Sequence, residues 1–431
     1  MASSDQPQTP PTTADAPTPT GIQTSPETPA AAAVPLPPLP QPSALTVAKF
    51  TRLRGWLDGT LVVLVLVFAF LIASSAVTNS DFFRQLATGR LLAQGDYHFG
   101  VDPFTYTSEG AYWVNHSWLF ALMVYALYQI PAIGGAAVVV CKALLVTALA
   151  GILLRTSRRA GQSLWIPAVC TALAILTISP RLYLQPFFLS FLFLGLTLWL
   201  LYRPTLSGGR QPPESFTQGA DAPRSERRSS LRAWWLLPPL FALWVNCDQW
   251  FFLGPLLVAL YLAGELLQQW FPLSDEEPDE TRQRELAWLA LVLLVGLAAC
   301  FLNPHHVHAF TLPAEFGLSP ANDQMQQDAQ FRVLFLSPLR QGYYTPNLGL
   351  SVAGLAYLPL LLLGLTSFVF LFGHVPWQRL LIWMGLALLS LYSARAIPLF
   401  AIVAGPITAL NWLDYACLLY TSDAADDLTR V

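Results

Sequence analysis

Long runs of apolar residues are the feature that most restricts what this sequence can fold into. Residues 56–77 and 350–372 form two such runs, and each is long enough for a helix to cross a bilayer, which takes about 20 residues. Only 11% of the 431 residues are charged and 54% are hydrophobic, whereas about a quarter of the residues of a soluble domain are charged. We therefore predict an all-α fold, a polytopic bundle of transmembrane helices.

Breaks at charged or proline-rich positions divide the apolar sequence into windows that we interpret as spans. They predict about ten or eleven crossings, at residues 57–78, 117–131, 134–154, 163–179, 183–202, 233–247, 249–268, 286–302, 350–372, 378–394 and 397–414.

Arginines set the predicted orientation of these spans. Six arginines lie within residues 203–232, and Arg155, Arg158 and Arg159 follow another span, so both segments are expected in the cytoplasm by the positive-inside rule. Basic residues just before the first span place the N-terminus there as well. These assignments agree only if residues 117–154 make fewer than two full crossings, either as one long broken helix or as a half-crossing followed by a span.

Two terminal segments are predicted to lie outside the bundle. Residues 1–44 hold 12 of the 35 prolines, and such a composition cannot bury enough apolar surface to offset chain entropy, so we expect a disordered cytoplasmic tail. Residues 417–431 begin Cys-Leu-Leu-Tyr-Thr-Ser-Asp-Ala-Ala-Asp-Asp, which resembles a translated sequencing adapter. We expect this stretch to be foreign, and the transmembrane domain to occupy residues 45–416 and to continue further in the natural protein.

This orientation places five polar clusters at the outer ends of the spans. They are residues 81–116, Arg181 with Gln185, Asn246 with Asp248, residues 303–347, and Arg395. Ionisable groups near span ends are costly unless they are paired or face a cavity. Their position on one side indicates a site there, although ordinary outer loops would give the same pattern.

The first cluster carries the most specific motifs. Asp-Phe-Phe-Arg-Gln-Leu-Ala-Thr-Gly-Arg begins at Asp81, Val-Asp-Pro-Phe-Thr-Tyr-Thr at Val101 and Trp-Val-Asn-His-Ser-Trp-Leu at Trp113. Apolar residues at positions 82, 83, 86, 87 and 91 predict an amphipathic helix on the membrane surface. The pattern resembles the first outer loop of bacterial GT-C fold glycosyltransferases, multispan enzymes that take sugars from polyprenyl-phosphate carriers.

The resemblance implies a bundle of GT-C type in the bacterial cytoplasmic membrane, with its site on the outer face. It also implies that Asp81 is the catalytic base or metal ligand and that Asp102 is the second acidic group of the loop. The loop departs from the family because it has no Asp-x-Asp or Asp-Asp pair, and Phe82-Phe83 stands where tryptophans are usual. In the alternative interpretation Asp81 caps its helix and Asp102 forms a turn before Pro103.

Physical chemistry assigns roles to these groups. A carboxylate that takes the proton of an acceptor hydroxyl contributes about 10²- to 10⁴-fold to a rate, and Asp81 is our candidate. A guanidinium binds a phosphate leaving group through paired hydrogen bonds, which suits Arg181 or Arg395, although both could be interface anchors. The remaining candidate substrate-binding residues are Gln185, His116, Asn246 and Asp248, and the last two suit a polar hairpin turn better than a binding role.

A divalent cation, Mg or Mn, would serve the leaving group if Asp102 and a histidine held it. His305 and His308 are spaced to share one helical face. No third ligand stands at a matching spacing, so a metal site is the weaker interpretation.

Two other functions compete with a glycosyltransferase that binds the bilayer and a polyprenyl-phosphate-linked sugar. A transporter or lipid flippase would show internal repeats and ionisable groups within spans; we find no repeat, and Lys142 and Glu265 are ionisable residues within span windows. A catalytically silent scaffold would explain the missing acidic pair. The 23 basic residues do not exceed the 26 acidic ones, so no nucleic-acid surface is expected.

Overall fold

The computed structural model describes most of the chain. The described residues are 44–76, 79–105, 110, 112–159, 161–207, 232–271, 280–311, 335–346 and 349–429. They fall into two units, Met1–Phe50 and Thr51–Val431, and the second holds the helical bundle. The predictions for residues 1–43 and for residues 208–231 of the arginine-rich loop lie outside the described residues.

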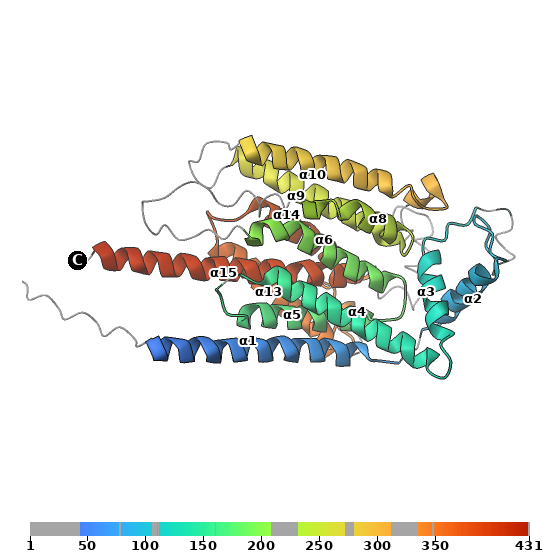
Figure 1. Ribbon diagram of the computed structural model, residues 1–431, viewed down its shortest axis with the longest axis horizontal. Helices are drawn as coiled ribbons and strands as arrows, with labels where there is room; N and C mark the ends of the chain where they lie inside the picture. Colours follow the sequence, from blue (N-terminus) through green and yellow to red (C-terminus); the bar gives the residue numbers. More distant parts are fainter. Residues whose placement is uncertain are drawn as a thin grey trace, which may run out of the picture. The chain divides into compact units, whose positions relative to one another are not determined.

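Helices make up most of the described chain (Figure 1). They are α1 (Ala44–Ala73), α2 (Asp81–Gln94), α3 (Trp118–Tyr128), α4 (Gly134–Ser157), α5 (Trp165–Ile178), η1 (Ser179–Arg181), α6 (Phe187–Ser207), α8 (Leu237–Val245), η2 (Gln249–Phe252), α9 (Leu253–Trp270), α10 (Glu280–Ala299), η3 (His306–Phe310), η5 (Gln341–Tyr343), α13 (Val352–Phe370), α14 (Trp377–Tyr392), η6 (Ala394–Ala396) and α15 (Ile397–Thr429). An isolated antiparallel bridge joins Gly100 to Trp113. The predicted all-α fold is confirmed.

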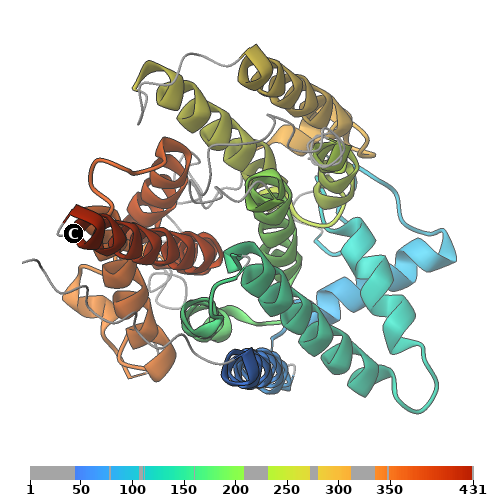
Figure 2. The same cartoon turned by 60° about the vertical axis from the view of Figure 1, so that its left-hand side comes forward.

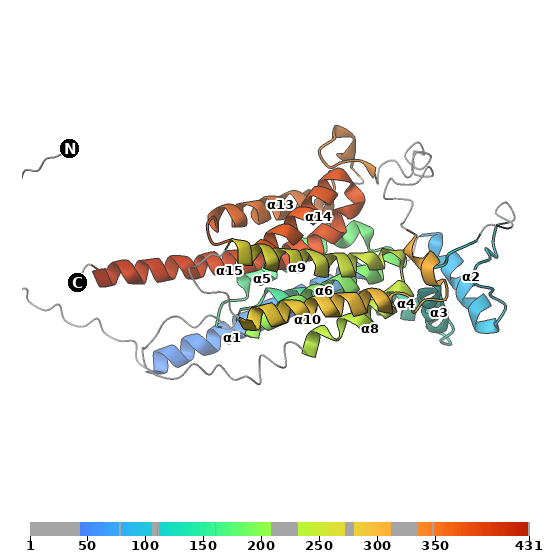
Figure 3. The same ribbon diagram turned by 90° about the horizontal axis from the view of Figure 1, so that it is seen from above.

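Five helical segments among the described residues are long and apolar enough to cross a membrane. They are Thr51–Ala73, Gly134–Ser157, Gln249–Trp270, Val352–Phe370 and Ala394–Tyr420. Apolar helices of 10 to 17 residues, such as Trp118–Tyr128, accompany them. The long helices run side by side along a common direction (Figures 1 and 3). The predicted membrane bundle is therefore confirmed, while its ten or eleven windows correspond partly to helices shorter than a bilayer.

The segment at residues 117–131 is one of these short helices. With 11 residues, α3 is about 16 Å long, roughly half of a hydrocarbon core. It lies across α2 at one end of the bundle (Figure 1). A Cβ atom added at Gly89 of α2 would lie 2.2 Å from the carbonyl oxygen of Ala121, so this crossing requires glycine. The structure thus has a short helix followed by the long α4, which is one of the two arrangements that the predicted orientation allows.

The surface helix predicted in the first outer loop is α2, which begins at Asp81 as expected. Its buried side differs from the predicted apolar face. The buried positions include Gln85, Thr88 and Gly89, which pack toward α3, while Phe83 is 69% exposed. Small and polar residues are buried here because α3 passes close to them.

The first and last helices differ in how much of their surface is buried. In α15, 94% of the apolar window is buried, against 17% in α1. Figure 2 shows α15 surrounded by other helices, and Phe400, Ile402 and Leu410 have no exposed surface. The outer side of α1 is therefore the side available to lipid.

The end of the bundle opposite α2 and α3 is held by an ionic cluster. Asp414 of α15 accepts a 3.1 Å hydrogen bond from Arg159, which follows α4, and one of 2.7 Å from Arg379 of α14. Arg379 also donates to Asn411 at 3.0 Å, and Asn411 donates to Ser367 of α13 at 3.1 Å. These bonds join four parts of the chain at the end predicted to be cytoplasmic.

Candidate functional site

The polar segments predicted to lie at the outer ends of the spans meet at the end that carries α2 and α3 (Figures 1 and 3). The side-chain amide of Asn79 donates to the carbonyl of Leu184 at 3.1 Å. The backbone N–H of Leu119 donates to the carbonyl of Asn246 at 3.2 Å. The backbone N–H of Asn115 donates to Nε2 of His305 at 3.1 Å. The loops after α1, α2, α5, α8 and α10 therefore form one assembly.

Asp81 is held by side chains. Its Oδ2 accepts a 2.7 Å hydrogen bond from Nε2 of Gln185, and its Oδ1 lies 3.4 Å from the guanidinium of Arg84. The side chain is 41% exposed. Ser80 is the N-cap residue of α2, so the carboxylate of Asp81 is not occupied in capping the helix. A carboxylate that is fixed in direction and open to solvent is suited to accept a proton from a docked hydroxyl.

Arg84 links the two acidic residues of the loop. Its guanidinium contacts Asp81, and its charge also acts on Asp102. The hydroxyl of Thr105 donates to Oδ2 of Asp102, and the backbone N–H of Phe104 donates to Oδ1 at 3.0 Å. These bonds lower the pKa of the Asp102 carboxyl, chiefly through Thr105, and they shape the turn before the aromatic part of the loop.

Arg181 and Arg395 lie within electrostatic range of each other. The positive charge of Arg395 acts on Arg181, as do the hydroxyl groups of Tyr183 and Tyr343. The guanidinium of Arg395 lies 5.9 Å from the centre of the Trp250 ring. Among the described residues no carboxylate or hydrogen-bond acceptor pairs with Arg181. Two neighbouring guanidinium groups of like charge favour an anion between or beside them.

One short segment, residues 181–185, carries both the arginine and the glutamine of this site. Lys142 of α4 is 1% exposed, and its ammonium group donates to the carbonyl oxygens of Ser75 and Leu182 at 3.0 and 3.3 Å. It thereby ties the end of α1 to this segment. Glu265, the other ionisable residue noted in a span window, accepts a 2.9 Å hydrogen bond from Arg282. Each has a structural partner, so neither lies as an isolated charge of the kind expected along a transport path.

Asn246 and Asp248 are buried connectors. Asn246 is 7% exposed; its Oδ1 accepts from the indole N–H of Trp118 at 2.9 Å, and its amide donates to the carbonyl of Leu302 at 2.8 Å. Asp248 is 3% exposed and accepts a hydrogen bond from Ser190. This placement corresponds to the polar-turn alternative more closely than to a surface that binds substrate.

His116 is buried too. Its Nε2 lies 2.8 Å from the carbonyl oxygen of Ala309, and its ring lies 6.4 Å from that of Phe251. Burial lowers the pKa of its imidazole, so the ring is neutral at pH 7 and donates to the carbonyl. His116 thus anchors the loop to η3.

His305 uses both ring nitrogens within the protein. Nε2 accepts from the N–H of Asn115, and Nδ1 lies 3.1 Å from the hydroxyl of Tyr112. Burial lowers the pKa of His305 to about 4. His308 is exposed and its ring lies 4.4 Å from that of Tyr112. His305 is therefore a neutral structural residue that follows α10 and holds the first outer loop in place.

These contacts do not fit the hypothesis that Asp102, His305 and His308 hold a divalent cation. His305 has no nitrogen left for a metal, and Asp102 is bonded to Thr105 and Phe104. In the part of the chain that the structure describes, no three His, Cys, Asp or Glu side chains are grouped closely enough to hold a metal ion. Two further aspartates of the segment 303–347, Asp323 and Asp328, lie outside the described residues.

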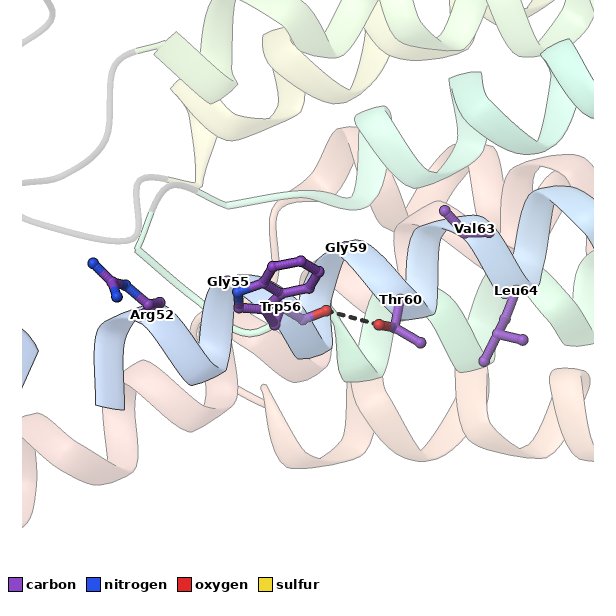
Figure 4. A pocket seen from close by; sticks show the side chains of 7 residues that line it. All are labelled: Arg52, Gly55, Trp56, Gly59, Thr60, Val63 and Leu64. Carbon is purple, nitrogen blue, oxygen red and sulfur yellow. Dashed lines mark hydrogen bonds between the residues drawn. The ribbon is translucent and has the colours of Figure 1, made fainter. Parts of the chain in front are cut away.

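A surface hollow lies elsewhere, on α1. It has a volume of about 560 Å³ and is lined by one face of that helix, from Arg52 to Leu64. Figure 4 shows Trp56 and Thr60 beside Gly55 and Gly59, with the hydroxyl of Thr60 bonded to the carbonyl of Trp56. The lining is mostly apolar and carries no acid or base suited to catalysis. This hollow lies on the exposed side of α1.

Comparison with known proteins supports the fold. No protein-family model matches the sequence, and no curated protein matches it significantly. A crystal structure of the Archaeoglobus fulgidus oligosaccharyltransferase, tethered with an acceptor peptide containing the NVT sequon via a disulfide bond, matches with a TM-score of 0.50 and 13% identity, over 83% of this chain and 50% of that one. The chain therefore shares the helical fold of this oligosaccharyltransferase, as the GT-C resemblance implied.

Two further structures are of the same archaeal enzyme. The apo form matches with a TM-score of 0.47 over 85% of this chain and 52% of that one, at 13% identity. AglB from Archaeoglobus fulgidus in complex with an inhibitory peptide and a dolichol-phosphate matches with a TM-score of 0.48, over 86% and 52%, also at 13% identity. Our chain thus spans about half the length of the oligosaccharyltransferase. At this identity the likeness concerns the fold alone.

Sequence reasoning missed two residues of the site. Arg84 stood within the quoted motif, but its contact with Asp81 depends on the i, i+3 spacing along α2, which was an available signal. Lys142 was noted only as an ionisable residue within a span. Its bonds to Ser75 and Leu182 come from segments far away in the sequence, and no local pattern identifies them.

Proposed function

We propose that this chain is an integral membrane glycosyltransferase that transfers a sugar from a polyprenyl-phosphate carrier to an acceptor hydroxyl. The GT-C fold supports a membrane enzyme of this class. The observation that carries the proposal is the pairing of Asp81 with Gln185 at 2.7 Å, four residues from Arg181 in the same segment. This pairing supports a base and an anion-binding group at the same end of the bundle.

Asp81 acts as the general base in this proposal. The acceptor oxygen attacks the anomeric carbon of the donor while its proton passes to the carboxylate of Asp81. The bond between that carbon and the phosphate oxygen breaks, and the lipid phosphate leaves with the bonding electrons. Gln185 and Arg84 keep the carboxylate directed toward the acceptor.

Arg181 and Arg395 bind the phosphate in this proposal. The leaving group gains negative charge as its bond to carbon breaks, and guanidinium groups placed beforehand stabilise that charge without reorganising. No step passes through a metal ion, because the described residues do not fit one.

The polar end of the bundle faces outward from the cytoplasmic membrane in this proposal, and the arginine-rich end faces the cytoplasm. The positive-inside rule supports this orientation. Single cysteines at Asp96 and at Ser207, in a chain lacking its native cysteines, test it with a membrane-impermeant thiol reagent. Labelling from outside is expected at Asp96→Cys only. Labelling at Ser207→Cys only would reverse the orientation.

Substitution of Asp81 tests the chemistry. Asp81→Asn keeps the size of the side chain and removes the proton acceptor, so we expect transfer of labelled sugar to fall by about 10²- to 10⁴-fold. Asp96→Asn, an exposed position at the end of α2, is the matched control and should retain the wild-type rate. Both variants should melt at the wild-type temperature. A wild-type rate in Asp81→Asn would eliminate Asp81 as the base.

A further inference from the structure

A cavity of about 250 Å³ lies between α2 and the loop that follows it. We call it the loop pocket. Aromatic and polar side chains share its lining, among them Arg84, Tyr97, Asp102, Phe104, Trp113 and Asn115. Arg84 connects this cavity with the proposed base, because its guanidinium also lies 3.4 Å from Asp81.

The walls of the loop pocket are fixed by hydrogen bonds within the loop. The N–H of Trp113 donates to the carbonyl of Gly100 at 2.9 Å, which closes the loop on itself. The amide of Asn115 donates to the hydroxyl oxygen of Tyr97 at 3.0 Å, while its backbone is held by His305. Gly100 has a φ of +91°, a conformation that favours glycine. The pocket is therefore formed before any ligand binds.

Several polar groups of the pocket retain unused hydrogen-bonding capacity. Tyr97 accepts from Asn115, and burial raises its pKa, so its hydroxyl keeps a proton to donate. Asp102 stays ionised because its hydrogen bonds lower its pKa. Within the described residues the indole N–H of Trp113 meets no acceptor. The pocket thus offers both donors and acceptors beside aromatic surfaces.

This combination suits one class of ligand. A sugar ring has apolar C–H faces, which pack on aromatic rings, and a rim of hydroxyl groups that both donate and accept. The charges of Arg84 and Asp102 balance, so the pocket favours a neutral ligand over a phosphate. Pockets for drug-sized ligands measure about 300–1,000 Å³, so this smaller volume is suited to a single ring.

We propose that the loop pocket binds one neutral sugar unit of the substrate beside Asp81. This inference rests on the proposed function and extends it by naming where the sugar ring lies. The ring can belong to the lipid-linked donor or to a glycan acceptor, since both present the same chemistry to the pocket.

Binding measurements on the full chain in lipid nanodiscs test the proposal. Dissociation constants are measured for a polyprenyl phosphate, for the same lipid carrying a hexose, and for a free oligosaccharide. Wild-type protein is expected to bind one of the two sugar ligands through the pocket. Trp113→Ala should raise the dissociation constant of that ligand by roughly tenfold. Affinity for the bare lipid phosphate should not change. The ligand whose binding weakens shows whether the ring belongs to the lipid-linked donor or to a glycan acceptor.

Two further variants guard against a trivial result. Phe83→Ala removes an aromatic ring from the same loop, but Phe83 is exposed and outside the pocket, so it should bind like wild type. Asp102→Asn provides a second probe if Trp113→Ala does not fold, and should also weaken the sugar ligand alone.

The outcomes separate this proposal from the proposed function. Unchanged sugar binding in both Trp113→Ala and Asp102→Asn, with transfer intact in wild type, would overturn the sugar pocket and leave the glycosyltransferase standing. Absence of transfer, and of binding to every ligand, by folded wild-type protein would overturn both.

Discussion

Nε2 of Gln185 donates a 2.7 Å hydrogen bond to Oδ2 of Asp81 across 104 positions of sequence. This bond joins the first turn of α2 to the segment that leads from η1 into α6. It fixes the direction of a carboxylate whose side chain is 41% exposed. The orientation of the proposed base therefore depends on a residue outside the first outer loop.

Gln185→Leu should lower turnover without weakening binding of the lipid substrate. Loss of the amide frees the carboxylate of Asp81 to rotate, and misplacement of a reacting group by about 1 Å can cost up to about 100-fold in rate. We expect kcat to fall by about tenfold or more with KM for the lipid donor unchanged. Gln94→Leu, an exposed position at the end of α2, is the matched control. An equal loss in both variants would mean that the bond to Asp81 is irrelevant to the rate.

Arg181→Gln should weaken binding of the lipid-linked donor and leave the fold at least as stable. Removing one guanidinium loses a charged hydrogen bond to phosphate, which corresponds to about 10- to 100-fold in kcat/KM. It also removes the repulsion between Arg181 and Arg395, so the melting temperature should hold or rise. Arg90→Gln on the exposed side of α2 is the control for a lost surface charge. Wild-type kcat/KM in both Arg181→Gln and Arg395→Gln would rule out the arginine pair as the phosphate site.

His305 should make thermal stability depend on pH between about 4 and 6.5. Burial lowers its pKa to about 4 in the folded protein, against about 6.5 in an unfolded chain. In this window the unfolded state binds more protons, so stability is complete above about pH 6.5 and is lost as the pH falls. His305→Gln cannot take up that proton and should show a flatter decline in melting temperature.

His116 contributes in the same direction, because burial lowers its pKa as well. A residual decline is therefore expected in His305→Gln. His98→Gln, an exposed position in the first outer loop, serves as the control and should follow the wild-type curve. A His305→Gln curve parallel to that of wild type would contradict the assignment of a neutral, buried ring.

Local patterns predicted the membrane bundle and the start of the surface helix. The apolar runs identified α1 and α13, because a helix that crosses lipid needs a continuous apolar sequence. The polar segment beginning at Asn79 located the first turn of α2. The orientation argument also anticipated that residues 117–131 would not be a full crossing. The inferences about the apolar runs and α2 depend only on neighbours in sequence.

Long-range contacts were beyond such reasoning. Asn246 and Asp248 had the same polar character as Arg181 and Gln185, yet the first two are buried in bonds to Trp118 and Ser190. Nothing in their spacing distinguishes a connector from a ligand. His305 was considered for metal binding on the basis of nearby histidines, while its partners Tyr112 and Asn115 lie about 190 positions earlier.

The five-residue stretch from Arg181 to Gln185 connects the two halves of the proposed site. Lys142 and Asn79 hold its middle in place, so an anion that draws Arg181 toward itself also alters the strain on Gln185. Coupling between two binding equilibria is reciprocal. If binding of the anion changes the proton affinity of Asp81, then protonation of Asp81 changes the affinity for the anion by the same factor. In the proposed mechanism, departure of the lipid phosphate and resetting of the base are then one coupled event.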